Sequence, residues 1–173
     1  MTSGSRPAPE PDRRGTRGFA PHDHAACVAE ALAVAEARCG AEGLRLTPVR
    51  RATLAILLAE HRALGAYAIL DRLSAGGFGS QPPVAYRALD FLVANGLAHR
   101  IERLNAFVAC DRPGVAHAPA FMICTRCEAV AEAPAAPGRG ALDDAARRAG
   151  FRIERAVLEA EGVCPACDGA GAG

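Results

Sequence analysis

The chain has 173 residues, of which 50% are hydrophobic and 23% are charged, and its formal net charge is +1. This length suits one ordinary domain or two small ones, and with 5% aromatic residues and no Trp the core must rest on Leu, Ala, Val and Ile. The longest apolar run, Leu54–Ala59, is far too short to cross a bilayer, which argues against a membrane protein.

Residues 1–22 are predicted to form a disordered tail. Met1–Pro21 mixes Arg, Pro, Gly and Asp and lacks the apolar stretch of a signal peptide. We therefore expect a cytoplasmic protein, and the cytoplasm keeps thiols reduced. For the seven Cys residues of the chain, this favours metal binding over a disulfide framework.

Four helices are predicted before residue 97. In the first, His24–Ala41, apolar residues recur at threes and fours. The second begins at Thr47, a good N-cap, and Pro48, which suits the first helical position, and it runs to about His61. The third and fourth helices are Ala66–Ser74 and a segment from Pro82-Pro83 to the stop signal Asn95-Gly96.

The fourth predicted helix has two different faces. Its apolar face consists of Ala85, Ala88, Leu89, Leu92 and Val93. Tyr86, Arg87 and Asp90 lie towards the opposite side. From Gly43 to Cys110 eight Arg stand against four acids, whereas from Asp111 onward seven Arg stand against nine acids, so the middle of the chain is the basic part.

After Gly96 the apolar period indicates a hairpin of Leu97–Arg103 and Ala106–Cys110, turning near Leu104-Asn105. Helix, helix, recognition-type helix and hairpin, in that order, predict a winged-helix DNA-binding domain over residues 23–110. A turn between Leu104 and Asn105 places His99 opposite Cys110, with Cβ atoms about 5 Å apart. The turn lacks an Asn-Gly or Asp-Gly signature, so the sequence specifies this register only weakly.

A second, smaller α/β unit is predicted over residues 120–168, after a hinge at 111–119 that contains two Pro and a Gly. Its elements are strands Phe121–Cys124 and Glu128–Glu132, helix Ala141–Ala149 and strand Phe151–Glu159, and residues 169–173 form a flexible tail. A unit of this size buries little apolar surface when it folds alone, so we expect it to pair with a second copy in a homodimer. The fold class is therefore α+β.

Two Cys-x-x-Cys pairs are the strongest motif, and they comprise Cys124, Cys127, Cys164 and Cys167. Four thiolates suit a closed tetrahedral structural zinc site, because each two-residue gap lets both sulfurs turn towards one metal. The alternative is a redox-active Cys-x-x-Cys, for which one pair would suffice.

A second set of possible ligands lies around the hinge and comprises His99, Cys110, His117 and Glu132. A metal held by all four would tie the DNA-binding unit to the second unit. The alternatives are a half-buried His, a Cys that behaves as a small hydrophobe and a solvated Glu. Spacing alone does not decide between these interpretations.

Tyr86 and Arg87 are the side chains of the fourth helix that we expect to be exposed and able to contact DNA. Arg can bind a guanine or a phosphate, and Tyr offers a hydroxyl or a ring face; the alternative is a packed Tyr beside a solvated Arg. Tyr67 and Arg50 are candidate supporting contacts. Arg100 and Arg103 on the hairpin are candidates for phosphate contacts from a wing.

Three motifs together resemble the ferric uptake regulator family, and best its zinc uptake regulator branch. They are Arg45-Leu-Thr-Pro-Val-Arg50, Pro82-Pro-Val-Ala-Tyr-Arg-Ala-Leu-Asp-Phe-Leu92 and the two Cys-x-x-Cys pairs, within a resemblance over about Ala25–Cys167. The resemblance implies structural zinc on the four paired Cys and sensory zinc on His99, Cys110, His117 and Glu132, two ions per monomer. A thiolate in the sensory site favours zinc over Fe(II) or Mn(II). Val84-Ala85 stands where the family usually has Thr-Val, which removes a hydroxyl that could contact a phosphate or cap the helix.

The resemblance implies a transcriptional repressor, not an enzyme, that binds a near-palindromic operator in double-stranded DNA as a zinc-loaded homodimer and represses zinc-uptake genes. No small-molecule substrate is expected. Alternatives are a same-fold regulator that senses another metal or thiol oxidation, and a zinc hydrolase. Catalytic zinc needs an open position for water, which four protein ligands do not leave.

Overall fold

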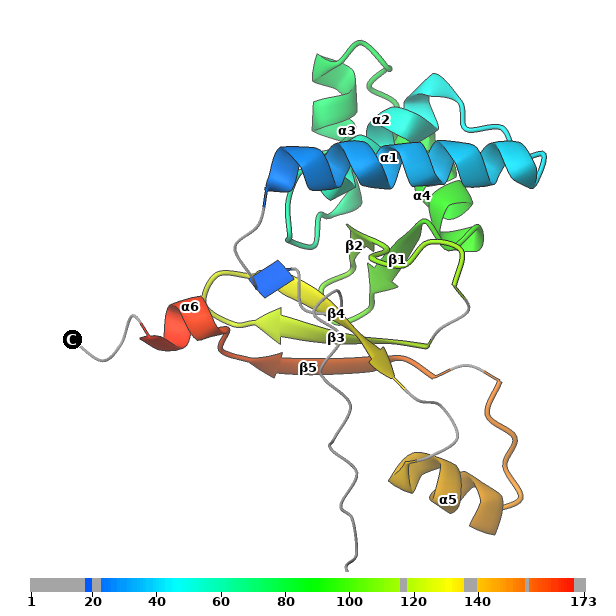
Figure 1. Ribbon diagram of the computed structural model, residues 1–173, viewed down its shortest axis with the longest axis vertical. Helices are drawn as coiled ribbons and strands as arrows, with labels where there is room; N and C mark the ends of the chain where they lie inside the picture. The colour runs from blue at the N-terminus through cyan, green and yellow to red at the C-terminus, as the bar shows by residue number, and fades with distance from the viewer. Residues whose placement is uncertain (1–17, 20–22, 116–117, 136–139, 155, 170–173) are drawn as a thin grey trace, which may run out of the picture.

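The computed structural model describes residues 18–19, 23–115, 118–135, 140–154 and 156–169. Four helices gather on one side, a two-stranded hairpin lies next to them, and a three-stranded sheet lies beyond the hairpin (Figure 1). In chain order the elements are α1 His24–Ala41, α2 Pro48–Leu58, α3 Ala66–Ala75, α4 Pro82–Ala94, β1 Ala98–Ile101, β2 Ala106–Ala109, β3 Ala118–Cys124, β4 Val130–Ala135, α5 Ala141–Arg148, β5 Leu158–Gly162 and α6 Pro165–Asp168. No helix in these described ranges is both long and apolar enough to span a membrane.

The four predicted helices are confirmed, with small changes at their ends. α1 has the predicted bounds and begins where the carboxylate of Asp23 accepts the backbone N–H of Ala26 at 3.1 Å. α2 ends at Leu58, before the predicted His61. Thr47 occupies the predicted N-cap position of α2, but its side chain makes no cap hydrogen bond.

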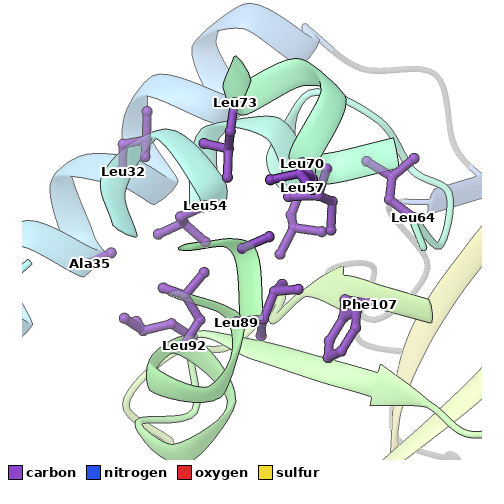
Figure 2. Packing of buried hydrophobic residues seen from close by; sticks show 14 of the residues in the cluster. Leu32, Ala35, Leu54, Leu57, Leu64, Leu70, Leu73, Leu89, Leu92 and Phe107 are labelled. Atoms are coloured by element: carbon purple, nitrogen blue, oxygen red, sulfur yellow. The ribbon is translucent and has the colours of Figure 1, made fainter. Parts of the chain in front are cut away.

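Helices α1–α4 and the hairpin β1-β2 together form the helical unit. It is built around the apolar face of α4, which packs against α2, α3 and the hairpin (Figure 2). Leu89 and Leu92 are fully buried, and Figure 2 shows them pointing towards Leu54 and the ring of Phe107. Val93, predicted to share this face, is instead 36% exposed, because it lies at the edge of the buried stripe. The α+β fold class is confirmed.

The hairpin has a different register from the predicted one. His99 pairs with Val108, not with Cys110, because four residues, 102–105, form the turn instead of two. Asn105 closes this turn in the left-handed region at φ 45°, which Asn tolerates better than most residues. The shift is two residues, so His99 and Cys110 still face the same side of the hairpin as diagonal neighbours.

The second unit is a mixed sheet with strand order β4-β3-β5. β3 pairs antiparallel with β4 and parallel with β5, and the connection that carries α5 makes the parallel pairing possible. β3 begins at Ala118, inside the predicted hinge. The predicted final strand Phe151–Glu159 is wrong in its bounds, since β5 begins only at Leu158, where its backbone comes alongside Ala120 of β3.

The two units also touch away from the hairpin. The loop between α2 and α3 lies along β4, where the N–H of Val130 donates to the carbonyl of His61 at 2.9 Å. The backbone of Arg62 pairs with that of Ala129 in an isolated antiparallel β-bridge, and its guanidinium forms an ion pair with Glu128 at 2.5 Å. No sequence motif marks this contact between the two units, and sequence reasoning missed it.

Part of the predicted tail is ordered against the sheet. Gly18 and Phe19 form a short helical turn, and a Cβ on Gly18 would lie 2.1 Å from the carbonyl oxygen of Val130, so only Gly fits there. Residues 1–17 and 20–22 of the tail, 116–117 of the hinge and 170–173 of the C-terminal tail lie outside the described residues.

Truncation of Leu89 tests whether α4 is the centre of the core. Leu89→Ala should lower the free energy of unfolding by about 2–5 kcal/mol, because it opens a cavity in a fully buried position. Val93→Ala, on the same helix but partly exposed, should cost less than about 1 kcal/mol. Denaturant unfolding of both variants checks this, and equal losses would contradict the packing described.

Candidate metal centres and nucleic-acid interface

The four Cys of the two Cys-x-x-Cys pairs come together at one end of the sheet. Cys124 ends β3, Cys127 follows in the next turn, and Cys164 and Cys167 lie at the N-terminal end of α6. Their sulfur atoms all lie within 4.8 Å of one another. The parallel pairing of β3 with β5 causes this, because it sets Cys124 beside Gly162, two residues before Cys164.

The donor set and its size fit zinc. In a tetrahedral site with Zn–S bonds near 2.3 Å, two sulfurs stand about 3.8 Å apart, and the sulfurs of Cys127 and Cys164 are 3.7 Å apart. All seven Cys are free thiols, so the cluster holds no disulfide. The N–H of Cys164 also donates to the sulfur of Cys124 at 3.4 Å, which is the hydrogen bonding expected of a thiolate.

The protonation of this cluster explains why it needs a cation. Backbone N–H groups of Cys164 and Cys127 lower the pKa of Cys124 to about 6. Hydrogen bonds with Cys127 and Cys164 raise the pKa of Cys167 to about 12. Cys124 therefore ionises readily, whereas the raised pKa values of Cys127 and Cys167 oppose ionisation, and a divalent cation would favour the thiolate forms.

The second predicted group also assembles, from both units. His99 of β1, Cys110 just after β2 and Glu132 of β4 place one donor atom each within 4.8 Å of one another. His99 Nε2 is 3.5 Å from Glu132 Oε2, and the His99 ring lies 5.4 Å from the ring of Phe121. The helical unit thus supplies an imidazole and a thiol, and the sheet supplies a carboxylate.

Glu132 is the most unusual residue of this group, since its side chain is only 5% exposed. Besides approaching His99, it accepts the backbone N–H of Asp111 at 3.0 Å. A buried carboxylate is costly unless it is paired or coordinates a metal. Burial and the nearby charge of Glu132 raise the pKa of Cys110 to about 12, so the two acids oppose each other's ionisation until a cation joins them.

Two further features of this group were not visible in the sequence. The N–H of Arg112 donates to the sulfur of Cys110 at 3.3 Å, and backbone donors of this kind have no sequence signal. A cavity of about 380 Å³ borders Cys110 and Glu132 and reaches Cys27 of α1. His117, the fourth predicted ligand, lies outside the described residues.

The predicted DNA-contacting residues fall into two sets. Tyr86 and Arg87 are exposed on the outer face of α4, and Tyr67 of α3 is 69% exposed. These three side chains are available to a partner on the outer surface of the helical unit. This arrangement is what a recognition helix requires.

The other three predicted contacts are engaged within the chain. The guanidinium of Arg50 stacks 3.7 Å from the ring centre of Phe91 and donates to the carbonyl of Arg45 at 2.6 Å. Arg100 donates to the side-chain oxygen of Asn105 at 2.7 Å. Arg103 faces the sheet, where its Nε is 3.4 Å from Glu161 Oε1. A DNA contact by any of them would compete with these interactions, so their role stays a prediction.

Removal of one paired Cys tests the first centre. Cys164→Ser should remove one tightly held zinc per chain and lower the melting temperature, because β3 and β5 lose their shared metal. Cys27→Ser is the matched control, since Cys27 belongs to neither ligand group. Elemental analysis and thermal unfolding check both variants, and unchanged zinc content in Cys164→Ser would rule out this site.

Comparison with known proteins gives a consistent result. No protein-family model matches the chain. The zinc uptake regulation protein of Escherichia coli (strain K12) is 39% identical over 141 residues, which cover 80% of this chain and 81% of that protein. The zinc uptake regulation protein of Shigella flexneri matches equally well.

Two solved structures share the arrangement of both units. A zinc uptake regulator complexed with zinc and DNA has a TM-score of 0.76 and 38% identity, covering 84% of this chain and 98% of that chain. Holo XcZur has a TM-score of 0.71 and 37% identity, covering 80% and 96%. The chain therefore belongs to the zinc uptake regulator branch of the ferric uptake regulator family.

Proposed function

We propose that this protein is a zinc-responsive transcriptional repressor that binds operator DNA as a zinc-loaded dimer and represses zinc-uptake genes. Its relatives carry the name zinc uptake regulation protein, and its fold is similar to that of a regulator complexed with zinc and DNA. It acts by binding and not as an enzyme. We assign residues 23–110 to the DNA-binding unit, 111–119 to the hinge and 120–168 to the dimerisation unit.

The observation that carries this proposal is the position of Glu132. It brings a carboxylate from the sheet to within ligand distance of His99 and Cys110, which belong to the helical unit. A cation bound by all three would neutralise the buried acids and connect the two units at this point. We propose His117, in the segment between the units, as the fourth ligand of this sensory zinc.

A second zinc ion, on Cys124, Cys127, Cys164 and Cys167, is proposed as structural. The two sites differ in what they connect. The four-Cys site joins β3 to β5 within one unit, whereas the sensory site joins two units. Loss of sensory zinc would therefore remove one attachment of the helical unit while the sheet stays folded.

The response to zinc follows from a shift between two populations. Without the sensory cation, Cys110 stays a neutral thiol, no metal joins it and His99 to Glu132, and the units sample several orientations. Zinc selects the orientation in which His99, Cys110 and Glu132 meet. At saturating zinc the equilibrium constant between the orientations shifts by the ratio of their zinc affinities. DNA binds the selected orientation, because only there are both recognition helices of the dimer held at the spacing of successive major grooves.

The surface of α4 supports the DNA part of the proposal. Tyr86 and Arg87 offer a phenol and a guanidinium on one exposed face, and Tyr67 of α3 is exposed as well. Val84 and Ala85 add no hydroxyl at the start of this helix, and Ala85 is buried. Arg87 is therefore the main positive group that α4 presents to DNA. We retain Arg50, Arg100 and Arg103 as lesser contacts, each of which would have to exchange its partner within the chain for DNA.

Pairing of two copies is supported by apolar side chains on the sheet unit. Leu142 of α5 is 58% exposed, Phe151 is 67% exposed and Leu158 of β5 is 49% exposed. Burial of these exposed apolar side chains against a second copy would remove their surface from water. We propose that this surface forms a two-fold dimer, which would match a near-palindromic operator.

The sensory site is tested by Glu132→Ala and Cys110→Ser. Each should reduce bound zinc from two ions to one per chain and abolish zinc-dependent binding to DNA. The probe is the duplex that zinc-loaded wild-type protein selects from a random-sequence library, here called the selected duplex. Cys27→Ser should behave as wild type in both measurements, and zinc-dependent binding that survives in both site variants would contradict the proposal.

The recognition helix is tested by Arg87→Ala. Loss of one base or phosphate contact should weaken binding to the selected duplex about 5- to 150-fold, which corresponds to about 1–3 kcal/mol. Arg152→Ala, an exposed Arg of the sheet unit, is the control and should bind normally. Fluorescence anisotropy at saturating zinc measures both affinities. Equal affinity of Arg87→Ala and wild type would remove α4 from the interface.

A further inference from the structure

The tip of the hairpin is held by a carboxylate from the other unit. Glu159, on β5, accepts the backbone N–H of Glu102 at 2.7 Å through Oε1 and that of Arg103 at 2.9 Å through Oε2. Two consecutive amides of the turn between β1 and β2 thus share one carboxylate. Both are charge-assisted hydrogen bonds, which are stronger than neutral ones.

A second acid on the same strand supports this contact. Glu161 lies two residues after Glu159, so both side chains project from the same side of β5. Its Oε1 is 3.4 Å from Nε of Arg103. One strand of the sheet therefore binds both the backbone and the side chain of the turn.

The turn that Glu159 holds has hydrogen bonds of its own. The N–H of Asn105 donates to the carbonyl of Glu102 at 3.2 Å, and Arg100 donates to the side-chain oxygen of Asn105 at 2.7 Å. β1 follows α4 directly, where the N–H of Leu97 donates to the carbonyl of Leu92 at 2.8 Å. Whatever fixes the turn therefore also fixes the direction of α4.

Glu159 acts at a different place from the sensory group. The sheet order β4-β3-β5 puts Glu132 on one outer strand and Glu159 on the other. The hairpin already packs on the sheet through a buried apolar cluster that includes Val108 and Phe121, and attachment at both outer strands further limits rotation of the helical unit. The docking of Arg62 on the loop after β3 adds a third point.

We propose that Glu159 is a positioning residue for DNA binding, which holds the hairpin turn and thereby favours the orientation in which the sensory ligands meet. This inference rests on the proposed function. Because the carboxylate stabilises the same orientation that zinc selects, it should raise the apparent affinity for sensory zinc as well as for DNA. This reciprocity is required thermodynamically.

The test is Glu159→Gln in the full chain. The amide keeps the shape of the side chain but replaces one acceptor with a donor that faces an N–H group. Binding to the selected duplex is measured across a series of buffered free zinc concentrations. We expect the zinc concentration for half-maximal binding to rise about 5- to 10-fold, and saturating zinc to restore most of the DNA affinity. Glu154→Gln, an exposed acid paired with Arg152, is the matched control and should leave the midpoint unchanged.

The possible failures are distinct. A wild-type protein that responds to zinc, with an unchanged midpoint in Glu159→Gln, overturns this inference alone. A lower melting temperature together with weaker DNA binding that zinc does not restore would make Glu159 merely structural and also overturns it. Wild-type DNA binding that is indifferent to zinc overturns the proposed function, and this inference with it.

Discussion

The arrangement of the two units depends on a buried carboxylate at their junction. Glu132 is almost fully buried, and its carboxylate lies beside a half-buried imidazole and a thiol and accepts a backbone N–H. A carboxylate and a thiol in such surroundings oppose each other's ionisation, as the raised pKa of Cys110 indicates. A bound cation would favour the thiolate of Cys110 beside the carboxylate of Glu132, and we infer that these residues join the two units when the cation is present.

The two candidate metal centres differ in their donors, because one offers four sulfurs and the other an imidazole, a thiol and a carboxylate. In the four-Cys site the ligands come in two local pairs, and the pairing of β3 with β5 brings these together. In the sensory group each described ligand comes from a different segment, and two come from the helical unit and one from the sheet. A site assembled within one unit supports the fold, whereas a site assembled across two units makes their orientation depend on the metal.

Much of this could be predicted because its signals are local. The helix bounds followed from periodicity and from caps such as Pro48, and the four-Cys cluster followed from spacing alone. The register of the hairpin could not be predicted, since its four-residue turn depends on Asn105 adopting a left-handed conformation. His99 and Cys110 still meet because a shift of two residues preserves the faces of a strand. The contacts of Glu159 and Arg62 escaped prediction because they join distant segments and involve backbone groups.

The central claim is that one zinc ion supports the fold and a second controls DNA binding. The most direct measurement is bound zinc per chain, by elemental analysis, before and after mild chelation of the wild-type protein, with DNA binding measured on the same samples. The account predicts that two zinc ions fall to one, that binding to the selected duplex is lost, and that added zinc restores it. One zinc ion throughout, with DNA binding indifferent to the chelator, would contradict it.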